Sequence, residues 1–204
     1  MTPIKFFTLT FLASFIFAFT SCSSDDDSCN ETLWYADNDS DGFGNANDFI
    51  SSCDQPENYV ANSTDINDNN ANLNPNTVWQ GEKITFSKSN NADWTLEANQ
   101  DRITNNVWIT RANNQGIFNI ATETNYTDFS SPSDTEWALG TTSSIEGLTF
   151  QNWEDTSGST PPNLVDQDMV VHLISDNIYI DIKFTSWQSG GQGGGFSYER
   201  SSSN

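Results

Sequence analysis

The chain has 204 residues, with 28 Asp and Glu against 7 Lys and Arg, and a formal net charge of −21. Phosphate recognition depends on clustered Lys and Arg, and no basic residue lies between Lys5 and Lys83, which argues against nucleic acid as a partner. An acidic chain of this kind favours a cationic partner, above all a metal ion.

Residues 1–21 are predicted to be a secretion signal. They hold one positive charge, Lys5, then an apolar run that ends at Phe19, then small residues before Cys22. The run is shorter than the roughly 20 residues that cross a bilayer. The sequence before Cys22 resembles a bacterial lipobox, with Phe19 where Leu is usual. The resemblance implies cleavage before Cys22 and lipidation of that cysteine, and an ordinary cleaved signal is the alternative.

Residues 22–31 are predicted to be an acidic linker. The run Ser23-Ser24-Asp25-Asp26-Asp27 resembles the export tag that follows the lipid-bearing cysteine in surface lipoproteins of Bacteroidetes-type bacteria. This implies anchoring in the lipid of the bacterial outer membrane through acylated Cys22, facing the cell exterior. Export is expected under either interpretation of the signal.

The cysteine count agrees with export. Setting Cys22 aside leaves Cys29 and Cys53 as an even pair in an oxidising compartment. We expect one disulfide between them, which would close a loop of about two dozen residues and contribute roughly 3 kcal/mol in the chain-entropy model. Two unpaired thiols are the alternative.

The run from Asp37 to Gly44 is typical of a calcium loop. Asp37, Asp39 and Asp41 stand at alternate positions before a glycine, so three carboxylates can surround a Ca²⁺ ion while Gly42 makes the sharp turn. Phe43 would add its backbone carbonyl. The twelfth position of an EF-hand count falls on Asp48, which reaches less far than the usual Glu, and no helical pattern flanks the loop. We therefore expect a compact loop in which calcium has a structural role, and an acidic turn without an ion is the alternative.

A second acidic cluster follows at residues 65–75, where Asp65, Asn67 and Asp68 are further candidate ligands. Its oxygens could complete the first site or form another, and a solvated turn region rich in Asp and Asn is the alternative. The whole of residues 22–77 has few branched apolar residues, so it would need ions and a disulfide to fold.

The blocks Trp34–Gly44, Cys53 with Gln55-Pro56, Tyr59–Ala61 and Asp65–Pro75 resemble, in this order, a metal-binding repeat of bacterial surface proteins that is related to thrombospondin type 3 calcium repeats. The resemblance implies a calcium-binding segment over residues 32–77. The chain departs from the usual Asp-Cys-Asp-Asp at Asp65 to Asp68, where it has Ile66 and Asn67. Cys29 would then replace the missing thiol as the partner of Cys53, and the amide of Asn67 would lower the affinity of the second cluster.

Residues 78–204 are predicted to form a mainly β domain, an antiparallel β-sandwich or partly closed barrel. Residues 175–177 read as a hairpin turn, followed by alternation of Ile180, Ile182 and Phe184 with polar positions. Eight strand-like runs carry the prediction: Lys83–Ser87, Arg102–Arg111, Gly116–Thr124, Thr135–Gly140, Leu148–Trp153, Met169–Ile174, Ile178–Trp187 and Gly195–Arg200.

The same domain resembles one that recurs in exported proteins of marine and Bacteroidetes-type bacteria and that has no assigned activity. The blocks that carry the resemblance are Glu97–Thr104, Val107–Arg111, Tyr179–Thr185 with Trp187, and Gly193–Arg200. It implies a reusable module, for which we expect binding or adhesion to a glycan or a surface-protein ligand. A polysaccharide hydrolase and a purely structural envelope protein are the alternatives.

Enzymatic function has few candidate residues. The one histidine, His172, lies in a strand-like run and is expected to be structural. Carboxylates such as Glu136, Glu154, Asp155 and Asp181 could pair for glycoside hydrolysis. Some of the tryptophans in this domain are expected in the core, and one or two could form a sugar-stacking platform. The loop of residues 190–195 lacks a P-loop lysine and is expected to be a flexible rim.

Overall fold

The computed structural model describes residues 29–204. The predicted signal of residues 1–21, the lipidation of Cys22 and the acidic tag of residues 23–27 lie outside the described residues, and so does most of the predicted linker. Within the described part of the chain, no helix has the length and apolar character that crossing a membrane requires.

The segment that was expected to be a loop contains a small antiparallel sheet. Strand β1 (Thr32–Ala36) lies between β2 (Phe49–Ser52) and β3 (Tyr59–Val60). The strands have two to five residues, too few for the alternation of apolar and polar side chains to be read in the sequence.

The predicted disulfide between Cys29 and Cys53 is confirmed. Thr32 is paired with Ser52 at the open end of the β1–β2 hairpin, so the two cysteines flank this hairpin in sequence. The disulfide therefore closes the hairpin on the side opposite its connecting loop, and that loop holds Asp37, Asp39 and Asp41.

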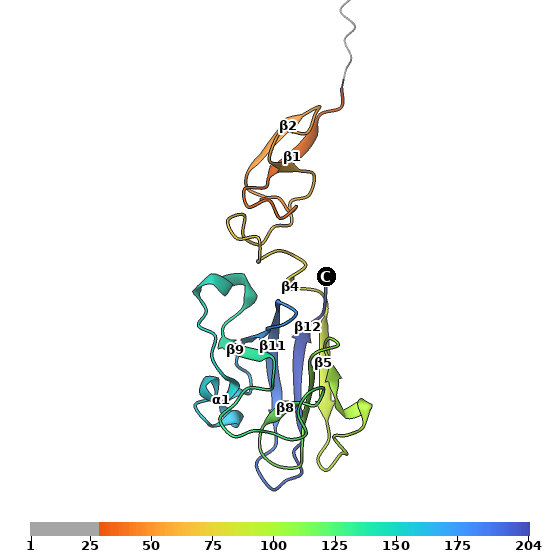
Figure 1. The fold of residues 1–204 in the computed structure, drawn as a ribbon, viewed down its shortest axis with the longest axis vertical. Coiled ribbons are helices and arrows are strands. Elements are labelled where there is room, and N and C mark those ends of the chain that lie inside the picture. The colour runs from red at the N-terminus through yellow and green to blue at the C-terminus, as the bar shows by residue number, and fades with distance from the viewer. Residues whose placement is uncertain (1–28) are drawn as a thin grey trace, which may run out of the picture. The chain divides into compact units, whose positions relative to one another are not determined.

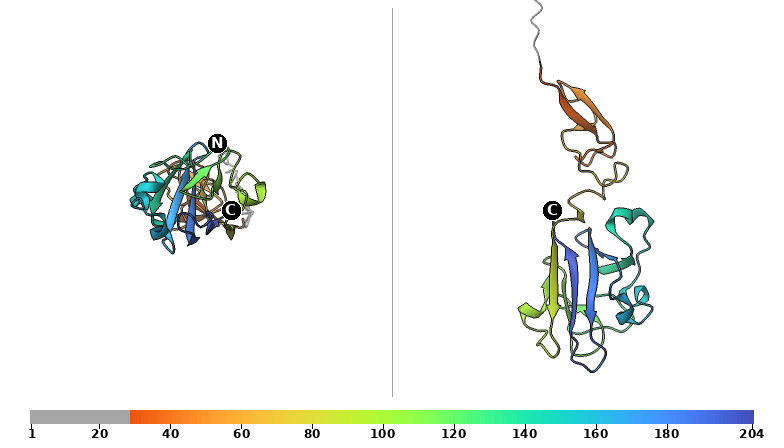
Figure 2. Two further views of the ribbon diagram at one scale, coloured as in Figure 1. Left: turned by 90° about the horizontal axis from the view of Figure 1, so that it is seen from below. Right: turned by 180° about the vertical axis from the view of Figure 1, so that it is seen from behind.

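The predicted β domain is built on one large sheet. Its strands run in the order β5 (Lys83–Lys88), β12 (Phe196–Ser201), β11 (Ile178–Trp187), β10 (Met169–Leu173) and β9 (Thr135–Leu139), all antiparallel to their neighbours. β4 (Val78–Trp79) is added to β11 in parallel. β5, β12 and β11 lie side by side in the right-hand view of Figure 2, where the C-terminus is near the start of β5.

A small antiparallel sheet forms the second layer. It consists of β6 (Asp101–Arg102), β7 (Trp108–Arg111) and β8 (Ile117–Asn119), and Figure 1 labels β8 beside the large sheet. Both sheets supply the main core, with Ile109 and Ile117 from the small sheet and Val171, Ile182 and Tyr198 among those from the large one. The expected mainly β, antiparallel architecture is confirmed, as two facing sheets without a closed barrel.

The predicted alternation along β11 is also confirmed. Ile180, Ile182 and Phe184 are buried in the main core, whereas Tyr179 packs against a second, smaller cluster around Val78. The turn before β11 contains Asn177, whose φ of 50° is a left-handed conformation that Asn tolerates.

Three of the eight expected strands differ in the structure. The run at 116–124 forms a strand only at β8, and a turn follows it. The run at 102–111 is split by a turn into β6 and β7. The run at 148–153 forms only one bridge, between Gln151 and Trp137, before helix α1 (Trp153–Thr156) begins. Asn152 caps this helix, because its side chain accepts a hydrogen bond from the backbone N–H of Asp155. The described residues also contain three 3₁₀ helices, at Glu97–Asn99, Thr142–Gly147 and Pro161–Leu164.

Candidate metal centre

Three of the predicted ligands converge directly after β1. Each of Asp37, Asp39 and Asp41 has a carboxylate oxygen within 4.8 Å of the others. The loop that brings them together is held by its own carboxylates, since Asp37 accepts hydrogen bonds from the backbone N–H groups of Asp41 (3.1 Å) and Gly42 (3.2 Å). Gly42 has a φ of 91°, so the sharp turn expected at this glycine is present.

The second acidic cluster folds back on the first loop. The backbone N–H of Asp65 donates to the carbonyl of Gly44 at 3.1 Å. Asp68 accepts from the backbone N–H of Asn38 at 2.7 Å and from its side-chain amide at 2.6 Å. Residues that are about twenty to thirty positions apart in the sequence therefore belong to one local arrangement.

Three carboxylate oxygens in this arrangement have no hydrogen-bond partner. They are Oδ2 of Asp39, Asp41 and Asp65, and each is shielded from solvent. An unpaired buried oxygen of an ionised carboxylate is costly. Because these three belong to acidic groups that repel one another, the arrangement is one that a bound cation would stabilise.

The pKa values of two of these groups reflect the same crowding. Burial, followed by the negative charges of Asp41 and Asp37, raises the pKa of Asp39. Burial also raises the pKa of Asp65, with further contributions from Asp41, Asp39 and Asp68. Asp65 thus interacts electrostatically with the first loop, in which Asp37, Asp39 and Asp41 could hold a metal ion.

The remaining predicted ligands have other contacts. Phe43 donates its backbone N–H to Asp41 at 2.9 Å. Asp48 has an exposed side chain outside the group of three aspartates. The side chain of Asn67 accepts from the N–H of Asn69 at 3.1 Å and donates to Glu146 at 2.5 Å. Both oxygens of Asp68 accept amide hydrogens, so Asp68 serves to align the two acidic clusters.

Two asparagines that were not among the predicted site residues support the loop. Asn62 accepts from the N–H of Gly44 at 3.2 Å and donates to the carbonyl of Gly42 at 2.8 Å. Asn45 donates to Asp68 at 3.4 Å. These residues sit in a segment rich in Asn, where no spacing distinguishes a supporting amide from a solvated one.

His172 lies in strand β10, and both of its ring nitrogens have partners, as expected for a satisfied strand histidine. Its Nδ1 lies 2.7 Å from Glu136 and its Nε2 lies 3.3 Å from Asn177. The ring stacks on Tyr179 with centroids 4.1 Å apart. The two polar partners are Glu136 in β9 and Asn177 in the turn before β11.

The candidate carboxylates of the β domain lie in different places. Glu136 pairs with His172, Asp181 accepts from Thr142 at 2.7 and 2.8 Å, and Asp155 accepts from Asn152. Glu154 is buried and accepts the hydroxyl hydrogen of Tyr126, and burial together with this bond raises the pKa of Tyr126. These two line a cavity of about 320 Å³ with Asp128 and Trp187.

Comparison with known proteins adds no assignment to these groups. No family model, no curated protein and no solved structure matches the chain.

Proposed function

We propose that the protein binds Ca²⁺ through its N-terminal segment and that the ion stabilises this segment as the support of a β-sandwich binding module. The observation that carries the proposal is the set of three shielded carboxylate oxygens without partners, on Asp39, Asp41 and Asp65. Asp37 lies in the same group. Two of the four residues have raised pKa values, which is consistent with a shortage of positive charge.

Calcium fits this donor set better than other common metals. All candidate donors are oxygens, which suits hard cations such as Ca²⁺ and Mg²⁺. Mg²⁺ requires near-ideal octahedral geometry, whereas Ca²⁺ accepts six to eight oxygens in irregular arrangements. The described residues offer one histidine, and both cysteines of the segment are in a disulfide, so a zinc site has few ligands. The likeness of residues 32–77 to thrombospondin type 3 repeats also supports calcium.

The proposal includes a location. The sequence before Cys22 supports lipid anchoring in a bacterial outer membrane, and the acidic residues after it support display on the cell exterior. The disulfide agrees with an oxidising compartment. On a cell surface, binding or adhesion is the activity that a β-sandwich on a metal-stabilised support would serve.

The experiment is a calorimetric titration of CaCl₂ into the protein from Ser23 to Asn204, together with thermal melts in calcium and in chelator. We expect saturable binding and a higher melting temperature in calcium, since a ligand at about 100 times its Kd adds about 2.7 kcal/mol. The double variant Asp39→Asn/Asp41→Asn should lose both effects. Asp54→Asn is the matched control, because Asp54 is an exposed aspartate of the same segment. Equal melting temperatures in calcium and chelator would contradict the proposal.

A second candidate function is hydrolysis of a surface polysaccharide. The observation in its favour is the cavity that combines Trp187 and Tyr126 with the carboxylates Asp128 and Glu154, since glycosidases use two carboxylates on either side of the scissile bond. The test is release of reducing sugar from polysaccharides, compared between the protein and its Glu154→Gln and Asp128→Asn variants. Release that both variants abolish would establish this function.

A further inference from the structure

A second depression of the β domain, of about 670 Å³, has a lining without any charged side chain. Its wall includes Trp94, Asn113, Asn114, Gln115, Thr124 and Asn125. Trp94 lies in the connection between β5 and β6, residues 113–115 lie in the turn between β7 and β8, and the last two follow β8. Its volume is in the range of ligand sites. In a chain with 28 acidic residues, a neutral surface of four amides, a hydroxyl and an indole is a distinct environment.

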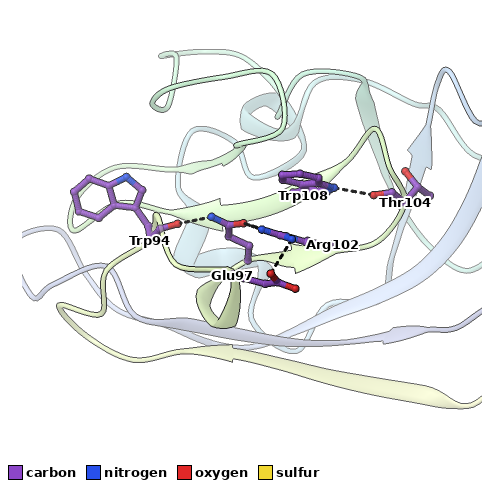
Figure 3. Close-up of polar contacts among 6 residues, drawn as sticks. Trp94, Glu97, Arg102, Thr104 and Trp108 are labelled. Atoms are coloured by element: carbon purple, nitrogen blue, oxygen red, sulfur yellow. Dashed lines mark hydrogen bonds and ion pairs between the residues drawn. The ribbon is translucent and has the colours of Figure 1, made fainter.

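Trp94 is available for a ligand because the core does not use it. Its side chain is partly exposed and belongs to neither apolar cluster. Figure 3 shows its indole pointing away from its neighbours, while its backbone carbonyl accepts a hydrogen bond from Gln100 at 3.1 Å. Trp108 differs, because Arg102 covers its ring at 4.3 Å and its Nε1 donates to Thr104 at 2.9 Å.

The amides of the depression provide donors and acceptors together. A primary amide can donate with its nitrogen and accept with its oxygen, which matches a pair of neighbouring hydroxyl groups. The side chains of Asn114, Gln115 and Asn125 are exposed, so their amides are accessible to a ligand. Asn114 accepts from the backbone N–H of Gly191 at 3.2 Å, which orients its amide.

Arg111 holds the turn that forms one wall of the depression. Its guanidinium donates to the carbonyls of Gln115 (2.8 Å), Gly195 (3.1 Å) and Gln188 (3.0 Å), and it stacks on Trp187 at 3.8 Å. The turn between β7 and β8 is therefore tied to the loop between β11 and β12. A wall that is rigid before binding loses little conformational entropy on binding.

We propose that this depression binds an uncharged polysaccharide, with Trp94 stacking on the apolar face of one sugar ring and the amides pairing with its hydroxyls. A polyanion would be repelled by a chain of net charge −21, and a cationic ligand would find no carboxylate in the lining. The inference rests on the proposed role of the β domain as a binding module and names its ligand class.

The neighbouring cavity indicates a ligand longer than one sugar. Gln115 lines both this depression and the cavity that contains Tyr126 and Trp187. A linear chain that stacks on Trp94 would extend past Gln115 toward Tyr126. We therefore expect affinity to increase from a disaccharide to a hexasaccharide of the same sugar.

The test is binding of the calcium-loaded protein from Ser23 to Asn204 to an array of uncharged glucan, xylan, mannan and galactan oligosaccharides, with polygalacturonate and chondroitin as charged probes. For the uncharged oligosaccharide that binds, we expect Trp94→Ala to lower the affinity by about tenfold or more, as loss of a stacking aromatic does. Asn125→Ala should lower it by a smaller factor. Leu96→Ala is the matched control, because Leu96 is exposed and two residues from Trp94, and it should leave the affinity unchanged.

Three results would overturn the inference: no binding to any uncharged probe by folded protein, preference for the charged probes, or equal affinity of the Trp94→Ala variant. The measurement is repeated with Asp39→Asn/Asp41→Asn. Sugar binding by this variant, combined with failure of calcium to bind the wild-type protein, would reject the metal role and retain the sugar site. Calcium binding by the wild-type protein without sugar binding would retain the metal role and reject the sugar site.

Discussion

Arg200 on β12 holds Asp101 on β6 through two parallel hydrogen bonds, from Nε at 2.6 Å and from Nη2 at 2.8 Å. Tyr198 adds a third bond to the same carboxylate at 2.8 Å. The side chains of Arg200 and Asp101 are only 7% and 9% exposed, so this is a buried ion pair that links the large sheet to the small one.

Breaking this pair should strongly destabilise the β domain. Arg200→Met leaves the carboxylate of Asp101 buried without its counter-charge, and the loss of one partner of a buried pair costs about 3–5 kcal/mol. Unfolding in urea would measure the change in free energy. Lys183→Met is the matched control, because its ion pair with Asp168 at 2.7 Å is solvent-exposed, and exposed pairs contribute little.

A double variant measures the energetic coupling between the two residues of the pair. Asp101→Leu combined with Arg200→Met removes both charges, so it should be less destabilised than Arg200→Met alone. A double variant that is as unstable as the sum of the single ones would show that the two residues act independently.

The disulfide gives a second prediction. Cys29→Ser/Cys53→Ser releases a loop of about two dozen residues and should destabilise the N-terminal segment by about 3 kcal/mol. Calcium should offset part of this loss, because a ligand of the folded segment adds stability as its concentration rises. Hydrogen exchange at the amides of β1 and β2, with and without calcium, would measure both effects. Identical exchange in the wild type and the double serine variant would refute the prediction.

Acid should weaken calcium binding at a higher pH than ordinary aspartates would allow. Calcium binds the ionised carboxylates, and the pKa values of Asp39 and Asp65 are raised above 3.8, mainly by burial. Protons therefore compete with the ion before an exposed aspartate would titrate. Calorimetric Kd values between about pH 7.5 and about pH 5 would show the decrease, and Asp54→Asn should leave this profile unchanged.

In chelator, the stability of the N-terminal segment should increase with falling pH, whereas calcium affinity decreases. A raised pKa means that the folded segment binds more protons than the unfolded chain between the ordinary pKa and the raised one. Its stability should then increase as the pH falls through this window. Asp39→Asn/Asp65→Asn removes both groups, so the difference in melting temperature between wild type and variant isolates their contribution. A difference that is independent of pH would contradict the raised pKa values.

Glycines of the loop between β11 and β12 should differ in their tolerance to substitution. A Cβ at Gly194 would lie 1.8 Å from the carbonyl oxygen of Ala112, and the φ of Gly194 is 67°, so Gly194→Ala should destabilise the domain by about 1–3 kcal/mol. Gly190→Ala should be neutral, because nothing lies within 4 Å of the added atom. Urea unfolding of the two variants makes the comparison.

This loop also shows a limit of sequence interpretation. A run rich in glycine was expected to be a flexible rim, yet Gly194 is packed against Ala112 and Gly195 against Asn90. Gly194 and Gly195 stand where neighbours that are distant in sequence leave no room for a side chain, whereas Gly190 and Gly191 have open space around them.

The features that sequence patterns predicted correctly are local ones. Asp37, Asp39 and Asp41 converge because alternate positions of one tight turn face the same centre, and β11 alternates because neighbouring side chains of a strand point to opposite faces. The neutral depression could not be predicted, since it needs Trp94 beside Asn113 and Asn125. The strand expected at 148–153 gives way to helix α1, which Asn152 caps.

The disulfide and the unpartnered carboxylate oxygens make the N-terminal segment sensitive to its surroundings in two ways. In a reducing compartment Cys29 and Cys53 would remain thiols, and where calcium is scarce the charges of Asp39, Asp41 and Asp65 would remain uncompensated. Under both conditions the segment lacks what holds it together, so its stability would depend on the redox state and the calcium concentration of the compartment in which the chain folds.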